Sequence, residues 1–136
     1  MPLIEWKKDF SVGVAVLDSH HRKLISLVNK LHDAMKNGKA KGVISGIISE
    51  LDDYTKYHFR EEEKLMEKIR YPGLNEHKKA HEYFTAAVKK YKAEADKGQA
   101  AFLSVGISVL LTDWLKNHIG MMDKKYQKDM NANGIR

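Results

Sequence analysis

Five of the seven histidines, together with one glutamate, occupy positions that a helical pattern turns toward the interior. These residues are His21, His58, Glu62, His77, His81 and His118. Burying a carboxylate and several imidazoles among apolar side chains is costly unless each polar group finds a partner. Imidazole and carboxylate are both common ligands of transition metals, so one kind of partner could satisfy all six residues. Their positions therefore predict a buried metal site.

The spacing of these residues supports the same interpretation. His77 and His81 are four residues apart, and so are His58 and Glu62, which places each pair on one face of a helix. Either pair alone could arise by chance, and a single buried histidine is usually a hydrogen-bonded core residue. All the predicted helices contribute such groups, however, and this makes coincidence the weaker explanation.

Turn signals divide the chain into the elements that must position these side chains. Asn37-Gly38, Tyr71-Pro72-Gly73 and Lys97-Gly98 are typical of helix ends and tight turns. The predicted elements are an arm at residues 1–17 and helices at about 18–37, 43–70, 75–96 and 99–130. Asp18 is the predicted N-cap of the first helix, and Gly38 the glycine that follows its end.

Apolar residues recur at intervals of three and four in every predicted helix, and no segment alternates as a strand does. Four amphipathic helices with short connections predict an all-α fold. Its architecture is an antiparallel up-down-up-down four-helix bundle that forms a single domain over residues 1–136. The arm contains Ile4, Trp6 and Phe10, so we expect it to pack along the bundle.

Antiparallel helices bring the predicted ligands to the same end of the bundle. His21 and His77 lie early in their helices, whereas His58 and His118 lie late in theirs. Asp123 follows His118 by five residues, and five residues of an ideal α-helix would rotate it about 140° away. A shared site therefore predicts a π-type turn or bend around Gly120. Five histidines and two carboxylates are too many ligands for one ion but suit two irons.

The composition limits the alternatives. The chain has no cysteine, which excludes disulfides, thiolate metal sites and a cysteine nucleophile. Its net charge of +6 suggests nucleic-acid binding, but only four of the 24 basic residues are Arg and the lysines are scattered. The N-terminus lacks a signal-peptide pattern, and the uncharged stretch from Gly98 to Thr112 is too short to span a membrane. These features predict a cytoplasmic protein without nucleic-acid binding or membrane insertion.

The joint pattern resembles the hemerythrin family, in particular its single-domain bacterial members. The residues that carry the resemblance are Asp18-x-x-His21, His58-Phe59-x-x-Glu62-Glu63-x-x-Met66, His77-x-x-x-His81 and Trp114-Leu115-x-x-His118-Ile119-x-x-x-Asp123. The match extends from Trp6 to Tyr126. The chain departs from the family at His20, where glutamine is frequent, and we expect His20 and His32 to lie at the surface.

The resemblance implies a non-haem di-iron centre that binds dioxygen reversibly. By analogy, His77, His81 and His118 bind one iron, His21 and His58 bind the other, and Glu62 and Asp123 bridge the two together with a solvent-derived oxygen. This arrangement leaves one coordination position open. The residues that match the family's oxygen pocket are Phe59, Trp114, Leu115 and Ile119, with Leu24 added as a reasonable fifth.

Three classes of function follow from the resemblance. A monomeric oxygen carrier or store without enzymatic activity is favoured, because the chain is one domain with no visible catalytic residue. Such a carrier could deliver oxygen to an oxygen-consuming partner enzyme. An oxygen or redox sensor usually needs an output domain. A di-iron oxidase, peroxidase or nitric-oxide-consuming enzyme should have fewer protein ligands than the seven found here.

Overall fold

The structure is a computed structural model that describes residues 4–38, 41–97, 107 and 109–136, and the regular elements within these ranges are all helical. The long helices are α1 (Ala15–Lys36), α2 (Lys41–Lys68) and α3 (Leu74–Asp96). The fourth helical segment comprises residues 109–113, the π-helix η2 (Trp114–Met122), the 3₁₀ helix η3 (Asp123–Tyr126) and α5 (Gln127–Ala132). The predicted start of this segment near residue 99 lies outside the described residues.

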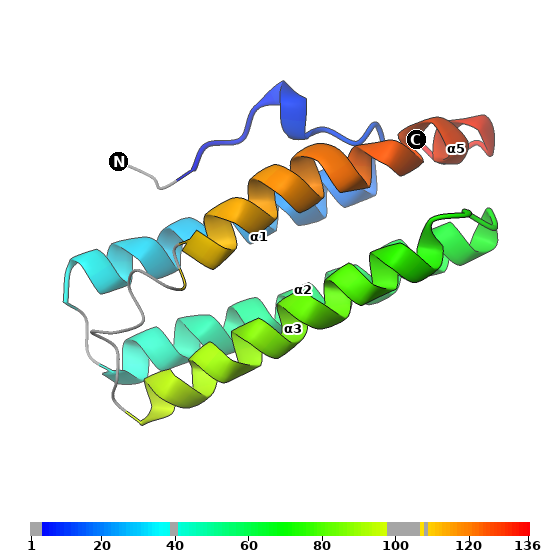
Figure 1. Cartoon of the computed structure of the whole chain (residues 1–136). Helices are drawn as coiled ribbons and strands as arrows, with labels where there is room; N and C mark the ends of the chain where they lie inside the picture. Colours follow the sequence, from blue (N-terminus) through cyan, green and yellow to red (C-terminus); the bar gives the residue numbers. More distant parts are fainter. Residues whose placement is uncertain (1–3, 39–40, 98–106, 108) are drawn as a thin grey trace.

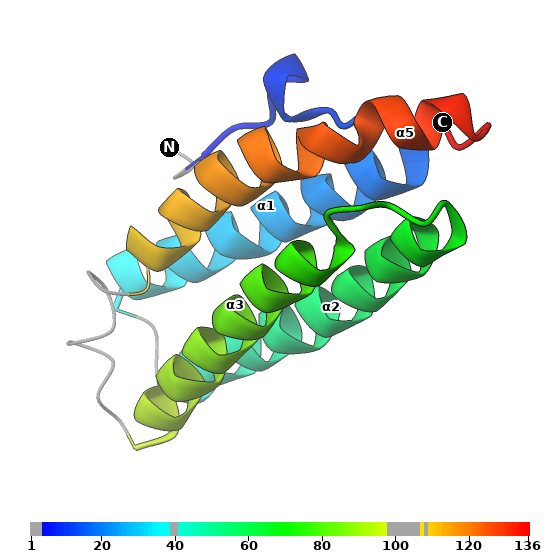
Figure 2. The same cartoon turned by 45° about the vertical axis from the view of Figure 1, so that its right-hand side comes forward.

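The helical segments lie side by side with alternating directions (Figures 1 and 2). The turn at Tyr71-Pro72-Gly73 joins α2 to α3 at one end of the bundle, and the fourth segment runs back beside α1. This arrangement confirms the predicted all-α antiparallel four-helix bundle. No helix in the described ranges combines the length and the apolar character that crossing a membrane would require.

The beginning of α1 differs from the prediction. The helix starts at Ala15 with Val14 in the N-cap position, so Asp18 lies inside the first turn and is not the N-cap. The Asp18 carboxylate accepts hydrogen bonds from the Ser11 hydroxyl at 2.6 Å and the Val12 N–H at 2.8 Å. It therefore holds the preceding arm against the helix, and this contact allows α1 to begin before Asp18. At the other end Gly38 has a φ of 63°, the left-handed conformation expected of a glycine after a helix.

The arm packs along the bundle, as predicted. The Asn29 side chain on α1 accepts a hydrogen bond from the Ile4 N–H at 3.0 Å and donates one to the Ile4 carbonyl at 2.8 Å. The Arg22 guanidinium lies over the Trp6 ring, 4.8 Å from its centroid. Ile4, Trp6 and Phe10 pack against the main apolar core. The arm includes the short 3₁₀ helix η1 (Lys8–Phe10).

Two apolar clusters make up the core, and the predicted ligands lie between them. On α1 the main cluster extends from Leu24 to Ala34, whereas Leu17 belongs to the smaller cluster, so His21 separates the two. On α2, Glu62 lies in the same way between Phe59 of the main cluster and Met66 of the smaller one. The bundle therefore contains a buried polar layer with apolar packing on both sides.

Candidate metal centre

The seven predicted ligands form two groups within the polar layer. Glu62, His77, His81, His118 and Asp123 make up one group, and His21, His58, Glu62 and Asp123 make up the other. Within each group one potential ligand atom per residue lies within 4.8 Å of all the others. The seven side chains are almost fully buried, and the most exposed of them, His118, has a relative accessibility of 5%. The two carboxylates belong to both groups.

Each carboxylate presents one oxygen to each group. Glu62 Oε2 lies 3.3 Å from His58 Nε2, whereas Glu62 Oε1 lies 3.0 Å from His81 Nε2. Asp123 Oδ2 lies 3.2 Å from His21 Nε2, whereas Asp123 Oδ1 lies 3.0 Å from His118 Nε2. This is the arrangement that two carboxylates need in order to bridge a pair of cations.

The distances between the imidazole nitrogens fit shared coordination. His21 Nε2 lies 3.2 Å from His58 Nε2, and His81 Nε2 lies 3.1 Å from His118 Nε2. Two nitrogens bound at right angles to one ion, each at about 2.1 Å, would be about 3 Å apart. Glu62 Oε1 and Asp123 Oδ2 are buried and accept no hydrogen bond from the described residues. Oxygens of this kind favour a cation among them.

The π-helix η2 explains how Asp123 reaches the site. Its nine residues, Trp114–Met122, end where the Asp123 N–H donates to the carbonyl of His118, a bond between residues five apart. The wider turn places residues five apart on one face, which an α-helix cannot do. Asp123 is fully buried and Gly120 lies within the π-helix. The distortion predicted around Gly120 from the spacing of the two ligands is confirmed.

Three further side chains support the predicted ligands and were not identified from the sequence. His81 Nδ1 lies 2.7 Å from Glu63 Oε2, and His58 Nδ1 lies 3.0 Å from His20 Nδ1. The Tyr126 hydroxyl donates a hydrogen bond to Glu62 Oε2 at 2.9 Å. Partners of this kind fix the orientation of a ligand and tune its basicity.

The expectation that His20 lies at the surface is wrong. Its relative accessibility is 7%, and its ring packs edge-on against His58 with the centroids 5.1 Å apart. A signal was present in the sequence, because Leu17, His20, Leu24 and Leu27 also recur at intervals of three and four. The buried face of α1 is therefore wide enough to include both adjacent histidines. His32 is partly buried.

Opposing effects set the pKa values in this layer. Burial lowers the pKa of His58 to about 4. Burial also acts to lower the pKa of His21 and His77, but the nearby carboxylates of Asp123 and Glu62 outweigh it and raise both to about 9. Burial would raise the pKa of Glu62, yet the surrounding imidazoles hold it well below its usual range. Without a cation, the site therefore keeps its carboxylates ionised and two imidazoles protonated.

The residues predicted to form an oxygen pocket do not all line one cavity. Leu24, Trp114 and Leu115 border a small apolar cavity of about 10 Å³, close to the smallest space that holds one water molecule. Phe59 lies outside this cavity and stacks on His81, with the ring centroids 3.9 Å apart and the planes at 5°. Trp114 also stacks on His118, at 3.8 Å and 11°. Ile119 is buried in the main core.

Comparison with known proteins identifies the family. The family model described as "Hemerythrin HHE cation binding domain" matches residues 12–128, which include all seven predicted ligands. The chain belongs to the hemerythrin family. Members of this family bind oxygen at a di-iron site, and the His, Glu and Asp cluster described above suits such a site.

Several curated hemerythrins are similar over most of their length. A bacteriohemerythrin of Pseudomonas aeruginosa is 38% identical over 128 residues, covering 93% of this chain and 80% of its own. A bacteriohemerythrin of Stenotrophomonas maltophilia is 35% identical over 132 residues, covering 97% and 84%. A myohemerythrin of Riftia pachyptila is 31% identical and covers 92% of each chain.

Solved hemerythrin structures share the fold. The crystal structure of a wild-type hemerythrin superposes with a TM-score of 0.82 at 28% identity, covering 93% of this chain and 96% of the other. A variant of hemerythrin in which a leucine is replaced by alanine gives a TM-score of 0.84 at 28% identity, covering 95% and 98%. These values extend the similarity from the sequence to the arrangement of the whole bundle.

Proposed function

We propose that this chain binds dioxygen reversibly at a di-iron centre and serves as an oxygen carrier or store. The observation that carries the proposal is that Glu62 and Asp123 each present one carboxylate oxygen to each of two groups of imidazoles. Glu62 and Asp123 would bridge the ions, with His77, His81 and His118 on one side and His21 and His58 on the other. The side with two histidines would keep a position free for a small ligand.

The surrounding residues support reversible binding by keeping water from the site. Two ferrous ions would supply the electrons that dioxygen takes up on binding and returns on release. Phe59 and Trp114 cover His81 and His118 with flat apolar faces, and Leu115 lines the small apolar cavity beside Trp114. A dry environment suppresses proton delivery, which would otherwise turn reversible binding into permanent oxidation.

The visible spectrum of the iron-loaded protein tests this proposal. Reduced protein that is exposed to air should develop a charge-transfer band, and purging with argon should remove it over repeated cycles. A band that bleaches irreversibly on the first exposure would instead support oxidase or peroxidase chemistry. Protein that retains no iron after anaerobic loading and gel filtration would contradict the proposal altogether.

Iron binding is expected to strengthen as the pH rises from about 7 to about 9. His21 and His77, whose pKa values are raised to about 9, carry protons at neutral pH when no cation is bound, and a metal ion must displace them. His58 is already neutral at these pH values, because its pKa is about 4. Each displaced proton makes the affinity rise about tenfold per pH unit. Displacement of both protons therefore makes it rise up to about 100-fold per pH unit. Anaerobic ferrous titration against a competing chelator measures this slope, and a flat profile would contradict the prediction.

Tyr126→Phe should lower the iron affinity about 10-fold, within the range known for partners of metal ligands. The change removes the hydroxyl that holds Glu62 Oε2 at 2.9 Å and leaves the buried ring in place. The pKa of Tyr126 lies well above its usual value because of burial and the nearby carboxylates, so the hydroxyl remains a donor. Tyr71→Phe, at a ring 6.3 Å from that of Tyr126, is the matched control and should bind iron normally. Equal affinities for the two variants would argue against this role of Tyr126.

A further inference from the structure

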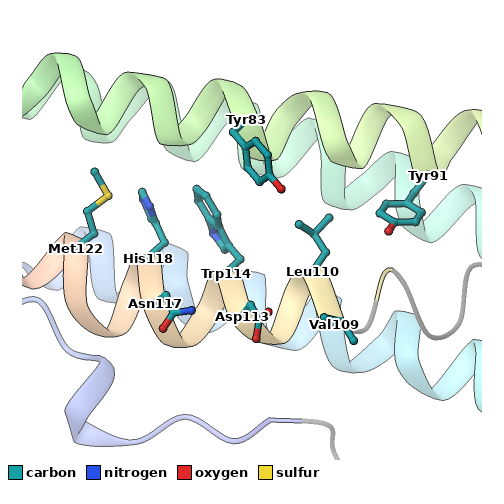
Figure 3. A pocket seen from close by; sticks show the side chains of 9 residues that line it. All are labelled: Tyr83, Tyr91, Val109, Leu110, Asp113, Trp114, Asn117, His118 and Met122. Carbon is teal, nitrogen blue, oxygen red and sulfur yellow. The ribbon is translucent and has the colours of Figure 1, made fainter.

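Two neighbouring grooves lie along the π-helix η2 and reach the group of predicted ligands that contains His77 and His118. The first, of about 490 Å³, lies between α3 and the fourth helical segment, and its walls include Trp114, His118 and Met122 (Figure 3). The second, of about 370 Å³, lies beside the turn between α2 and α3, and its walls include His77, Met121 and Met122. Met122 thus lines both grooves and Met121 lines the second, each together with a predicted ligand.

The first groove also adjoins the small apolar cavity. Trp114 lines both spaces, and the cavity and the groove share no other residue. Figure 3 shows the side chains of Trp114, His118 and Met122 rising in a row from the fourth segment toward α3. The Met122 thioether therefore lies in the groove that Trp114 divides from the cavity, two positions along this row from Trp114 and next to the predicted ligand His118.

We propose that Met121 and Met122 form an oxidation site that captures hydrogen peroxide as it leaves the metal centre. The proposal rests on the proposed function, because the oxidant is hydrogen peroxide, which a di-iron centre held by the predicted ligands would supply by giving two electrons to dioxygen together with two protons. The thioether sulfur attacks one peroxide oxygen, the O–O bond breaks and an S–O bond forms. The sulfur loses two electrons, and the other oxygen leaves as water with both protons. The product is methionine sulfoxide, which methionine sulfoxide reductases return to methionine.

The placement of the other methionines in the described part of the chain makes the site selective. Met121 has a relative accessibility of 64%, so both oxidants and repair enzymes can reach it. Met66 and Met130 are fully buried in the smaller core cluster. Met35 is partly exposed but lies near the end of α1, beside the main core cluster and at the opposite end of the bundle. It provides an internal reference for oxidation by peroxide that arrives from bulk solvent.

Site-resolved mass spectrometry of the iron-loaded protein tests the proposal. In one sample, ferrous protein is exposed to air with catalase present, and the visible spectrum is followed until the oxygenated form has decayed. In a second sample, ferric protein without catalase receives hydrogen peroxide from the solution. The ratio of sulfoxide at Met121 and Met122 to sulfoxide at Met35 should be at least about fivefold higher in the first sample, because peroxide meets the groove before it meets catalase.

A double variant separates this site from general surface oxidation. Met121→Leu combined with Met122→Leu conserves volume and should increase the hydrogen peroxide that reaches the solution when the oxygenated form decays without catalase, whereas Met35→Leu should not. Equal ratios in the two samples, or loss of all sulfoxide at Met121 and Met122 when catalase is present, would overturn the proposal. Failure of the oxygenated band to appear would instead overturn the proposed function, so the two failures are distinguishable.

Discussion

Exchange of Glu62 for glutamine should weaken the binding of both iron ions at once, by at least about 100-fold, since even outer partners of metal ligands contribute 10-fold to 100-fold. The reason lies in the two oxygens of Glu62, which face His58 at 3.3 Å and His81 at 3.0 Å. Glutamine keeps the shape but provides one oxygen and no charge. Its NH₂ group would face either His58 or His81, in place of a carboxylate oxygen, and could not bind a cation there.

Iron content after anaerobic loading and gel filtration measures this effect. Glu61→Gln is the matched control, because Glu61 is the preceding residue and, within the part of the chain that the structure describes, forms an ion pair only with Lys64, at 3.4 Å on the surface. The Tyr126 hydroxyl can still donate to the amide oxygen in Glu62→Gln, so the metal-free variant should fold, as circular dichroism can verify. Two tightly bound ions per chain in Glu62→Gln would show that the carboxylate does not join the two groups.

Replacement of Leu115 by threonine should shorten the lifetime of the oxygenated protein about tenfold or more by making the site wetter. Leu115 has a relative accessibility of 1% and borders the small apolar cavity together with Leu24 and Trp114. An apolar cavity of this size stays dry, but a hydroxyl in its wall gives a water molecule a partner and brings a proton donor close to the bound ligand. Decay of the visible band in air measures the lifetime.

Leu31→Thr separates this effect from a general loss of packing. Leu31 is fully buried in the main cluster and does not border the cavity, so its replacement costs similar apolar contact without wetting the site. Oxygenated Leu31→Thr should decay as slowly as the unmodified protein. If Leu115→Thr and Leu31→Thr decay at the same rate, Leu115 has no special role in the pocket.

The sequence is most informative where a polar side chain occupies a position that the helical periodicity reserves for apolar residues. Imidazoles at His21, His58 and His118 interrupt apolar stripes, and the cost of burying them is enough by itself to predict a shared partner. The antiparallel directions of the helices then predicted that these residues meet. Periodicity does not report distances across the bundle, however, so the hydrogen bond from Tyr126 to Glu62, between residues 64 apart, was not predictable.

Other errors have local causes. Asp18 matches the composition of an N-cap, but its carboxylate binds Ser11 and Val12 of the arm, and the arm contributes the first residues of the helix. His20 is adjacent to the predicted ligand His21, and a helix with a narrow apolar stripe turns only one of two adjacent residues inward, whereas α1 buries a wider face between its neighbours. The local sequence allows either start of α1 and either a buried or an exposed His20. In both cases contacts with other parts of the chain determine the outcome.

The π-helix lets this part of the chain hold one residue more than an α-helix would need between the same two ligands. Between His118 and Asp123 the backbone carries a wider turn, and the positions between them, including Gly120, are not predicted ligands. Loss of one intervening residue together with a return to ordinary α-helical winding would leave the two ligands four residues apart, about 40° from each other on the same face. The wider turn therefore absorbs a one-residue difference in length, and relatives with either spacing can present the same pair of ligands.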